Sequence, residues 1–143
     1  MKPPNNASLA KVICLQASSP KEKIHKILKV IHECYEARKM LLLKTESQGT
    51  TDYLDKLLWE FPKDSFIPHS LSFPSESTII ISSSKEIPSS IYSILNFTKE
   101  SLINFPFLSK IYEIEDLTSP EKKQIFEKKY KDYSNLGYHL ISL

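Results

Sequence analysis

The chain has 143 residues, of which 41% are hydrophobic and 25% are charged, and its formal net charge is +2. This balance supports one sizeable core and excludes a disordered chain, so we expect a single domain over residues 1–143, with 1–6 as a loose tail. The small net charge argues against the whole molecule being a nucleic-acid binder, and no apolar run approaches the roughly 20 residues of a membrane span.

The first half of the chain alternates strand-like and helix-like segments. An apolar run at 8–15 predicts a strand that is buried on both faces. Ser19 is the expected N-cap of a helix that runs to about residue 37, because a proline and then a glutamate follow it at the capping positions. A second buried strand is expected at 39–44 and a second helix at 50–59. This alternation predicts a parallel α/β sheet with right-handed crossovers.

The second half contains several strand-like segments before a last helix and a final strand. Content of β-branched residues or alternation of apolar and polar residues predicts each strand, while serine-rich and proline-containing pieces predict the loops between them. The expected strands are 65–68, 78–82, 91–97, 110–115 and 138–142, the helix is 119–134, and the loops are 72–77 and 82–90. The fold class is therefore α/β, with a Rossmann-like, mostly parallel sheet flanked by helices.

Phosphate-binding chemistry is not supported by the sequence. Loops that cradle a phosphate need glycines where backbone amides approach the ligand, and the chain has only Gly49 and Gly137. We therefore expect a sheet that lacks a nucleotide-binding loop and needs no cofactor. The histidines are scattered rather than clustered at ligand spacing, so we expect no metal site. No serine or cysteine stands in a nucleophile motif, so the sequence supports no catalytic residue.

The two cysteines, Cys14 and Cys34, are isolated from each other. Cys14 falls in a strand-like run, and Cys34 falls on the apolar side of the first helix. Neither stands in a CxxC motif, and no secretion signal precedes them. Because buried thiols mostly act as small hydrophobic groups, we expect both to be reduced core residues of a cytoplasmic protein.

An aromatic and proline-rich segment at 54–71 is the most distinctive stretch of the chain. Its aromatic residues and prolines include Trp59, Phe61, Pro62, Phe66 and Pro68. One interpretation is that Trp59 and Phe66 fill the core where a helix turns into a strand. The other is an exposed ridge that docks an apolar partner, because prolines prevent inner-strand pairing and rigid aromatic rings are efficient interface anchors. Composition alone leaves both interpretations open.

The last predicted helix is rich in lysine and tyrosine. On a helical wheel Ile125, Phe126 and Tyr133 face the core, while Lys123 and Tyr130 share one flank with Glu127 between them. A basic flank beside an aromatic rim suits a short acidic peptide or a phosphate backbone. The alternative is a solvated helix whose lysines keep the surface soluble. Ion pairs between residues four apart contribute only about 0.3 to 0.5 kcal/mol each, so helix support alone explains the pattern poorly.

Both segments resemble one protein family. The motifs that carry the resemblance are Leu54-Asp55-Lys56-x-Leu58-Trp59 with Ser65-Phe66-Ile67-Pro68-His69-x-Leu71, and Lys129-Tyr130-Lys131-x-Tyr133 with Gly137-Tyr138. Together they resemble the chi subunit of the bacterial DNA polymerase III clamp-loader complex. The resemblance implies a non-catalytic accessory subunit with a Rossmann-like sheet that has lost nucleotide binding.

The resemblance also implies partners and contact residues. A chi subunit links the clamp loader, through the psi subunit or an equivalent protein, to the acidic C-terminal tail of single-stranded DNA-binding protein, so DNA is met only indirectly. Matching positions give the psi-side contacts as Trp59, Phe66, Ile67, Pro68 and His69. The tail-side contacts are Lys123, Lys128, Tyr130 and Lys131. Glu127 stands where the family often has a basic residue, so the tail site is expected to be weaker, altered or shifted toward Lys128 or Lys131.

Two other classes of function remain open on the residues alone. The first is a small nucleotide-dependent α/β enzyme, for which a nucleotide-induced rise in melting temperature would be diagnostic. The second is a module that binds nucleic acid directly through the last helix, which would show a steeply salt-dependent affinity for DNA without any protein partner.

Overall fold

The computed structural model describes residues 9–60, 67–71, 73 and 77–143, and the tail expected at 1–6 lies outside these ranges. Helices and strands follow one another along this part of the chain. In order they are β1 (Lys11–Ala17), α1 (Pro20–Glu36), β2 (Leu41–Lys44), α2 (Gln48–Glu60), β3 (His69–Ser70), β4 (Ile79–Ser82), β5 (Ser93–Asn96), β6 (Lys110–Asp116), α3 (Pro120–Asn135) and β7 (His139–Ser142).

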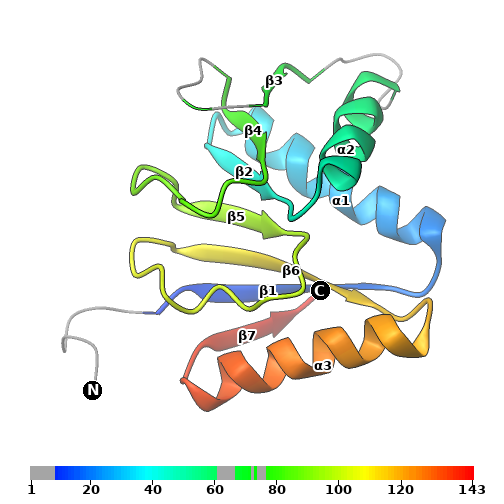
Figure 1. The fold of residues 1–143 in the computed structure, drawn as a ribbon, viewed down its shortest axis with the longest axis vertical. Helices are drawn as coiled ribbons and strands as arrows, with labels where there is room; N and C mark the ends of the chain where they lie inside the picture. The colour runs from blue at the N-terminus through cyan, green and yellow to red at the C-terminus, as the bar shows by residue number, and fades with distance from the viewer. Residues whose placement is uncertain (1–8, 61–66, 72, 74–76) are drawn as a thin grey trace.

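The strands form a single seven-stranded sheet in the order β3-β4-β2-β5-β6-β1-β7 (Figure 1). Every neighbouring pair in it is parallel. The predicted Rossmann-like α/β fold is therefore confirmed, and the described sheet is wholly rather than mostly parallel. Strands covered on both faces are apolar at consecutive positions, which is why β2 and β4 were recognisable as continuous runs of leucine and isoleucine.

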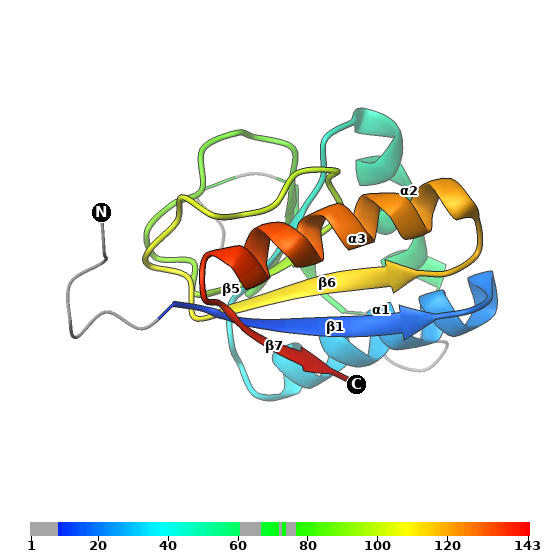
Figure 2. The same cartoon turned by 90° about the horizontal axis from the view of Figure 1, so that it is seen from below.

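Helices cover both faces of the sheet (Figure 2). α1 and α2 pack on one face, where their buried leucines and isoleucines meet Leu15, Leu43 and Leu95 of the strands. α3 packs on the other face through Phe126 and Tyr133. Segments 83–92 and 97–109 supply further buried side chains to that second core: Ile87, Ile91, Leu102 and Leu108. Cys14 and Cys34 are buried and form no disulfide, as the sequence predicts.

Serine caps determine where α1 and α3 begin. Ser19 Oγ accepts a hydrogen bond of 3.1 Å from the Glu22 N–H, and Ser119 Oγ accepts one of 3.2 Å from the Lys122 N–H. Each serine has extended backbone angles, and a proline follows it at the first helical position, where the missing N–H has no helical acceptor to lose. Both helix starts are therefore confirmed as predicted.

The strand predicted at 65–68 is wrong in its described part. Ile67 and Pro68 are not in a strand, and pairing with β4 starts at His69. Pro68 has no N–H to donate to a ladder, which moves the start of pairing beyond it. Residues 65 and 66 lie outside the described ranges. The other predicted strands and helices are present, with boundaries that differ by a few residues.

The neighbouring strands β1 and β6 are followed by helices on opposite faces of the sheet. β1 continues into α1 and β6 into α3, and Ala17 and Asp116 are paired at the ends of these two strands. A switch of this kind opens a crevice at the carboxyl ends of the strands, which is where α/β proteins usually bind ligands. The chain thus has the crevice of a nucleotide-binding sheet, while its sequence has no glycine-rich loop to line it.

Candidate functional site

Trp59 lies on the outer side of the last turn of α2. The residues that this helix buries recur at spacings of three and four, and they are Thr51, Leu54, Leu57 and Leu58. Trp59 falls off that stripe, and 65% of its surface is exposed. For Trp59 the interpretation as a core-filling residue is therefore wrong, and the structure agrees with the interpretation as an exposed aromatic residue.

The other predicted psi-side residues occupy different environments. Pro68 is exposed, whereas Ile67 is only 1% exposed and belongs to the core beneath α2. Ile67 therefore supports this surface from below and presents little of its side chain to a partner. Phe66 lies outside the described residues. We call Trp59, Pro68 and His69 the Trp59 surface.

His69 connects β3 to α2. Its Nε2 lies 2.6 Å from Asp55 Oδ1, and its Nδ1 lies 2.8 Å from the Ile67 carbonyl oxygen. The side chain is only 3% exposed. Its ring also meets the Trp59 ring edge to face, with centroids 6.1 Å apart. His69 thus fixes the place of Trp59 more than it offers a contact of its own.

The predicted tail-side residues lie on the outward surface of α3. Lys123, Lys128 and Lys131 are exposed, and none of them forms an ion pair with a described residue. Tyr130 is 43% exposed, and its ring lies 6.0 Å from that of Phe126. Within the described chain Glu127 also makes no ion pair, so the intrahelical pairs that the sequence allows are absent. We call Lys123, Lys128, Tyr130 and Lys131 the α3 lysine surface.

These two surfaces stand at opposite ends of the sheet. β3, beside the Trp59 surface, is the first strand in the sheet order, whereas α3 packs against β6 and β7 at the other end. Strands are spaced about 4.8 Å apart, so six intervals separate the two edges by roughly 29 Å. Figure 1 shows α2 and α3 at the two ends of the molecule.

A buried ion pair beneath α3 was missed by the sequence analysis. Lys129 Nζ lies 2.9 Å from Glu113 Oε1, and both residues are almost inaccessible to solvent. The Tyr133 hydroxyl and the Asn96 amide donate hydrogen bonds of 2.7 and 2.8 Å to Glu113 Oε2. Lys129 also donates to the Thr98 carbonyl oxygen. Burial raises the pKa of the Glu113 carboxyl, while Lys129 and the two hydrogen bonds oppose that rise.

The spacing of residues carried a signal for this pair. Lys129 is three residues after Phe126 and four before Tyr133, which places it on the apolar stripe of the helix. Glu113 follows the buried Ile111 by two residues in β6, so the alternation of side chains along the strand places Glu113 on the same buried face. A lysine and a glutamate at two core positions of facing elements predict each other, because neither is buried without a partner.

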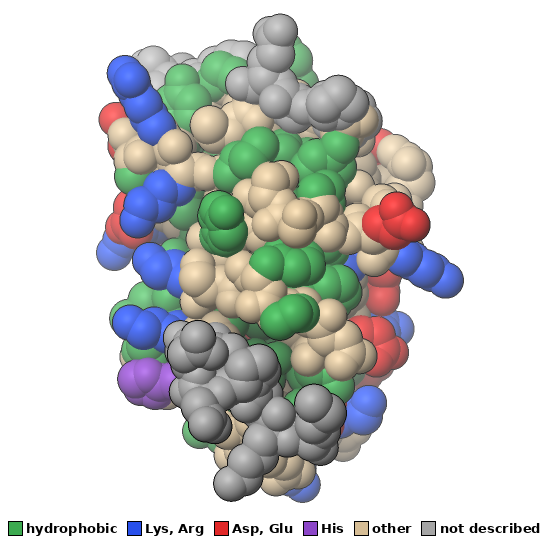
Figure 3. Space-filling model, turned by 90° about the vertical axis from the view of Figure 1, so that its left-hand side faces the viewer, with side chains coloured by type: hydrophobic (Ala, Val, Ile, Leu, Met, Phe, Trp, Pro, Cys, Tyr) green, Lys and Arg blue, Asp and Glu red, His purple; other side chains and the backbone are tan. Residues whose placement is uncertain are grey.

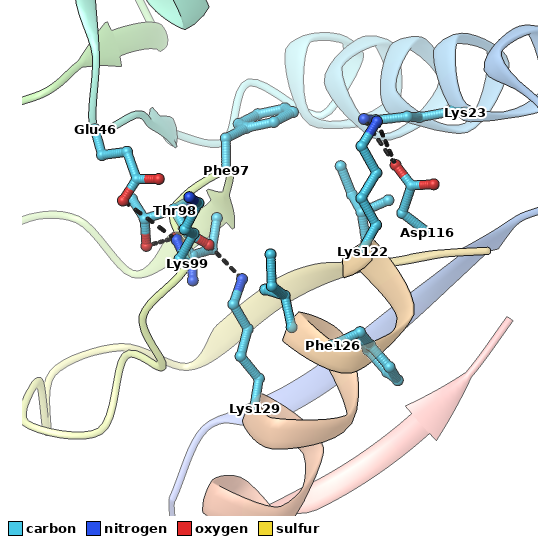
Figure 4. A pocket seen from close by; sticks show the side chains of 12 residues that line it. Lys23, Glu46, Phe97, Thr98, Lys99, Asp116, Lys122, Phe126 and Lys129 are labelled. Carbon is cyan, nitrogen blue, oxygen red and sulfur yellow. Dashed lines mark hydrogen bonds and ion pairs between the residues drawn. The ribbon is translucent and has the colours of Figure 1, made fainter. Parts of the chain in front are cut away.

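A cavity of about 200 Å³ opens beside this switch point, between the ends of β5 and β6 and the helices α1 and α3 (Figure 4). Lys23 and Lys122 converge on Asp116 at one end, with Nζ to Oδ2 distances of 3.0 and 3.8 Å. At the other end the Lys99 N–H donates to Glu46 Oε2 at 3.4 Å. The apolar part of the lining comes from Phe97, Ile114, Ile125 and Phe126. We call this space the switch cavity.

Asp116 is a carboxylate of the switch cavity that accepts several hydrogen bonds. Burial tends to raise its pKa, but hydrogen bonds from the Thr118 hydroxyl and N–H and from Lys23 outweigh burial and lower the pKa to about 2. A pKa lowered in the folded state means that ionised Asp116 stabilises the fold at neutral pH. This contribution is complete above pH 4 or so and is lost as the pH falls toward 2.

We expect Asp116→Asn to lower the free energy of unfolding by about 2 kcal/mol at pH 7, since a shift of one pKa unit corresponds to roughly 1.4 kcal/mol. Urea denaturation at pH 7 and at pH 3 measures the effect, and the difference from the original chain should shrink at the lower pH. Glu121→Gln, which alters an exposed carboxylate of α3, is the control with little effect at either pH. A difference of the same size at both pH values would contradict the role of ionised Asp116.

A third surface lies at the side of the sheet formed by the amino-terminal ends of the strands. Figure 3 shows this edge with apolar side chains gathered in a band across it. Exposed apolar residues in the segments that lead into β5, β6 and β7 are Tyr92, Ile103 and Leu136. Patches of this kind often mark contacts with other proteins, and the sequence analysis did not identify this one.

The described residues contain neither a metal-binding cluster nor a membrane-spanning helix. No group of three or more histidine, cysteine, aspartate or glutamate side chains is placed to hold a metal ion in ranges 9–60, 67–71, 73 and 77–143. No helix of that part of the chain is long and apolar enough to cross a membrane. Gly137 has a φ of 85° just after α3, so it serves the helix end, where glycine is the usual residue.

Fold and surfaces together define the class: a Rossmann-like α/β protein with a parallel sheet, no glycine-rich phosphate loop in its sequence, and two exposed surfaces toward opposite ends of the sheet. The family model of the DNA polymerase III chi subunit, HolC, matches residues 11–141, and the chain belongs to this family. The resemblance carried by the two motif blocks is thereby confirmed, and the chain has an accessory role in DNA replication. Among curated proteins no match is found.

Proposed function

We propose that this chain is a non-catalytic bridge in the replication machinery. Its Trp59 surface binds the clamp-loader side, through a psi subunit or an equivalent protein. Its α3 lysine surface binds the acidic C-terminal tail of single-stranded DNA-binding protein. The chain itself needs no cofactor for this role, meets DNA only through its partners, and acts in the cytoplasm.

The observation that carries the proposal is the separation of the two surfaces. They belong to opposite halves of one sheet, whose two edge strands are roughly 29 Å apart by strand spacing. A typical protein interface buries about 800 Å² on each partner, which is a patch of similar width. Two partners can therefore bind at the same time without overlapping, and a rigid parallel sheet connects them.

The clamp-loader side suits an apolar, pre-ordered contact. Trp59 is exposed, yet its ring is fixed against His69, which is itself held by Asp55 and the Ile67 carbonyl group. A tryptophan that is already ordered loses little conformational entropy when a partner covers it. Aromatic anchors of this kind carry a large share of the binding energy in protein interfaces.

The tail side suits an acidic peptide. Lys123, Lys128 and Lys131 present ammonium groups that no described carboxylate neutralises, and Tyr130 offers an aromatic ring between them. Carboxylates form charge-assisted hydrogen bonds with such groups. Glu127 is exposed on the same helix, one turn from Lys123 and from Lys131, and it repels an acidic ligand, so it weakens the contact.

We expect a fluorescent acidic tail peptide to bind the chain and to lose about tenfold in affinity when salt rises from 0.05 to 0.3 M, because exposed charges are screened within a few ångströms at high salt. Fluorescence anisotropy measures this. The paired variant Lys128→Ala with Lys131→Ala should bind more weakly, and Lys39→Ala, which removes an exposed lysine elsewhere, should bind as the original chain does. No saturable binding at either salt concentration would refute the tail contact.

A further inference from the structure

We propose that the chain has a binding site for a small organic carboxylate at the carboxyl ends of β2, β4 and β5, with the ammonium group of Lys44 as its anchor. The site is a cavity of about 340 Å³ whose lining includes Lys44, Ser83, Leu102 and Phe105. We call this space the Lys44 cavity. The inference goes beyond the bridging function, because neither the Trp59 surface nor the α3 lysine surface contributes a residue to this lining.

Lys44 carries a buried charge that no described carboxylate balances. Two lysines are buried in the described part of the chain, Lys44 at 8% exposure and Lys129 at 6%. Lys129 is paired with Glu113 at 2.9 Å, whereas Lys44 forms no ion pair with a described residue. A buried charge without a partner is costly, so the fold favours an anion that enters beside Lys44.

The ammonium group of Lys44 lies at the wall of the cavity. Its Nζ donates a hydrogen bond of 2.8 Å to the Ser84 carbonyl oxygen, and the two chain neighbours of Ser84, Ser83 and Lys85, both line the cavity. Lys44 is two residues after Leu42, whose side chain belongs to the core that segments 83–92 and 97–109 cover. The alternation of side chains along β2 therefore turns Lys44 toward these two segments.

The protonation of Lys44 is sensitive to what occupies the cavity. Burial lowers the pKa of the Lys44 ammonium, and the charge of Glu46 opposes that effect. A carboxylate in contact with Nζ would raise the pKa again, because an opposite charge favours the charged form. An ammonium group has three N–H donors, so Lys44 can bind a carboxylate and keep its hydrogen bond to Ser84.

Size and charge restrict the ligand. The volume of about 340 Å³ lies at the lower end of the roughly 300 to 1,000 Å³ of small-molecule sites. Glu46 and Glu100 are exposed carboxylates of the lining, and they equal Lys44 and Lys85 in number. They repel a ligand with two negative charges, such as a phosphate ester, more strongly than a ligand with one. A single carboxylate on a small apolar body therefore fits the Lys44 cavity best.

A titration of the ¹⁵N-labelled chain with benzoate, benzamide and phenyl phosphate tests the site. Benzamide has nearly the shape of benzoate without its charge, and phenyl phosphate has a higher charge. We expect benzoate to bind with a millimolar Kd and benzamide about tenfold more weakly, because only benzoate forms a charge-assisted hydrogen bond with Lys44. Phenyl phosphate should also bind more weakly than benzoate. The backbone amide signals that move should be those of the lining residues, among them Ser83 and Leu102.

Two variants assign the effect to one lysine. Lys44→Met keeps a long apolar stem and removes the charge, so it should bind benzoate no better than benzamide. Lys39→Ala removes an exposed lysine elsewhere and should keep the preference for benzoate. The comparison of the three ligands uses the original chain, so it decides even where Lys44→Met does not fold.

Four results would overturn the inference. The first is equal affinity of the original chain for benzoate and benzamide, and the second is tighter binding of phenyl phosphate than of benzoate. The third is a preference for benzoate that survives in folded Lys44→Met. The fourth is the absence of saturable binding up to about 20 mM benzoate, or a set of moving signals that belongs to another surface.

Discussion

Lys129→Met is expected to lower the free energy of unfolding by about 3 to 5 kcal/mol, the usual cost of leaving a buried charge without its partner. The substitution keeps a long apolar stem but removes the ammonium that lies 2.9 Å from Glu113. It also removes the donor to the Thr98 carbonyl oxygen. Urea denaturation followed by circular dichroism measures the loss.

Two further variants make the result specific. Lys128→Ala removes an exposed lysine from the neighbouring position and should change the free energy of unfolding by less than about 0.5 kcal/mol. Adding Glu113→Gln to Lys129→Met should restore part of the lost stability, because the unpaired carboxylate is then gone. If Lys129→Met unfolds at the same urea concentration as the original chain, the ion pair does not hold α3 on the sheet.

Trp59→Ala is expected to weaken binding to the psi subunit, or to the equivalent clamp-loader protein, by about 30-fold or more, which corresponds to 2 kcal/mol or more for an aromatic anchor. The thermal melt should stay unchanged, because most of the Trp59 side chain is already exposed in the free chain. Isothermal titration calorimetry with the purified partner gives the affinity, and circular dichroism gives the melt.

The matched control for this prediction is Tyr53→Ala. Tyr53 belongs to the same helix and is 49% exposed, but it lies nearly two turns before Trp59. It should bind the partner as the original chain does. A lower melting temperature for Trp59→Ala, or equal partner binding by both variants, would show that Trp59 is not the anchor of this surface.

Local patterns were enough to predict most of the fold. Ser19 and Ser119, each followed by proline, gave the starts of two helices because capping is decided within one turn. Continuous apolar runs gave the buried parallel strands for a similar reason. The order of strands in the sheet could not be obtained this way, since it depends on which crossover passes which strand.

The candidate site was predicted unevenly, and the reason is again physical. Sequence composition identified Trp59 as a distinctive residue but did not predict its exposure, because the end of a helix can present a tryptophan ring either to solvent or to the core. The burial of Lys129 was not predicted, although its spacing from Phe126 and Tyr133 carried the signal, because its partner Glu113 lies on another element. The switch cavity joins Lys23, Lys99 and Lys122 from distant parts of the chain, and no local pattern predicts such a meeting.

The central claim is that one chain holds two partners at once, and a co-retention experiment tests it most directly. Single-stranded DNA coated with its binding protein is immobilised, and the clamp-loader partner is added with or without this chain. We expect the partner to be retained only when the chain is present, and Trp59→Ala to be retained itself without bringing the partner. Retention of the partner in the absence of the chain, or binding of either partner only by displacing the other, would contradict the bridge.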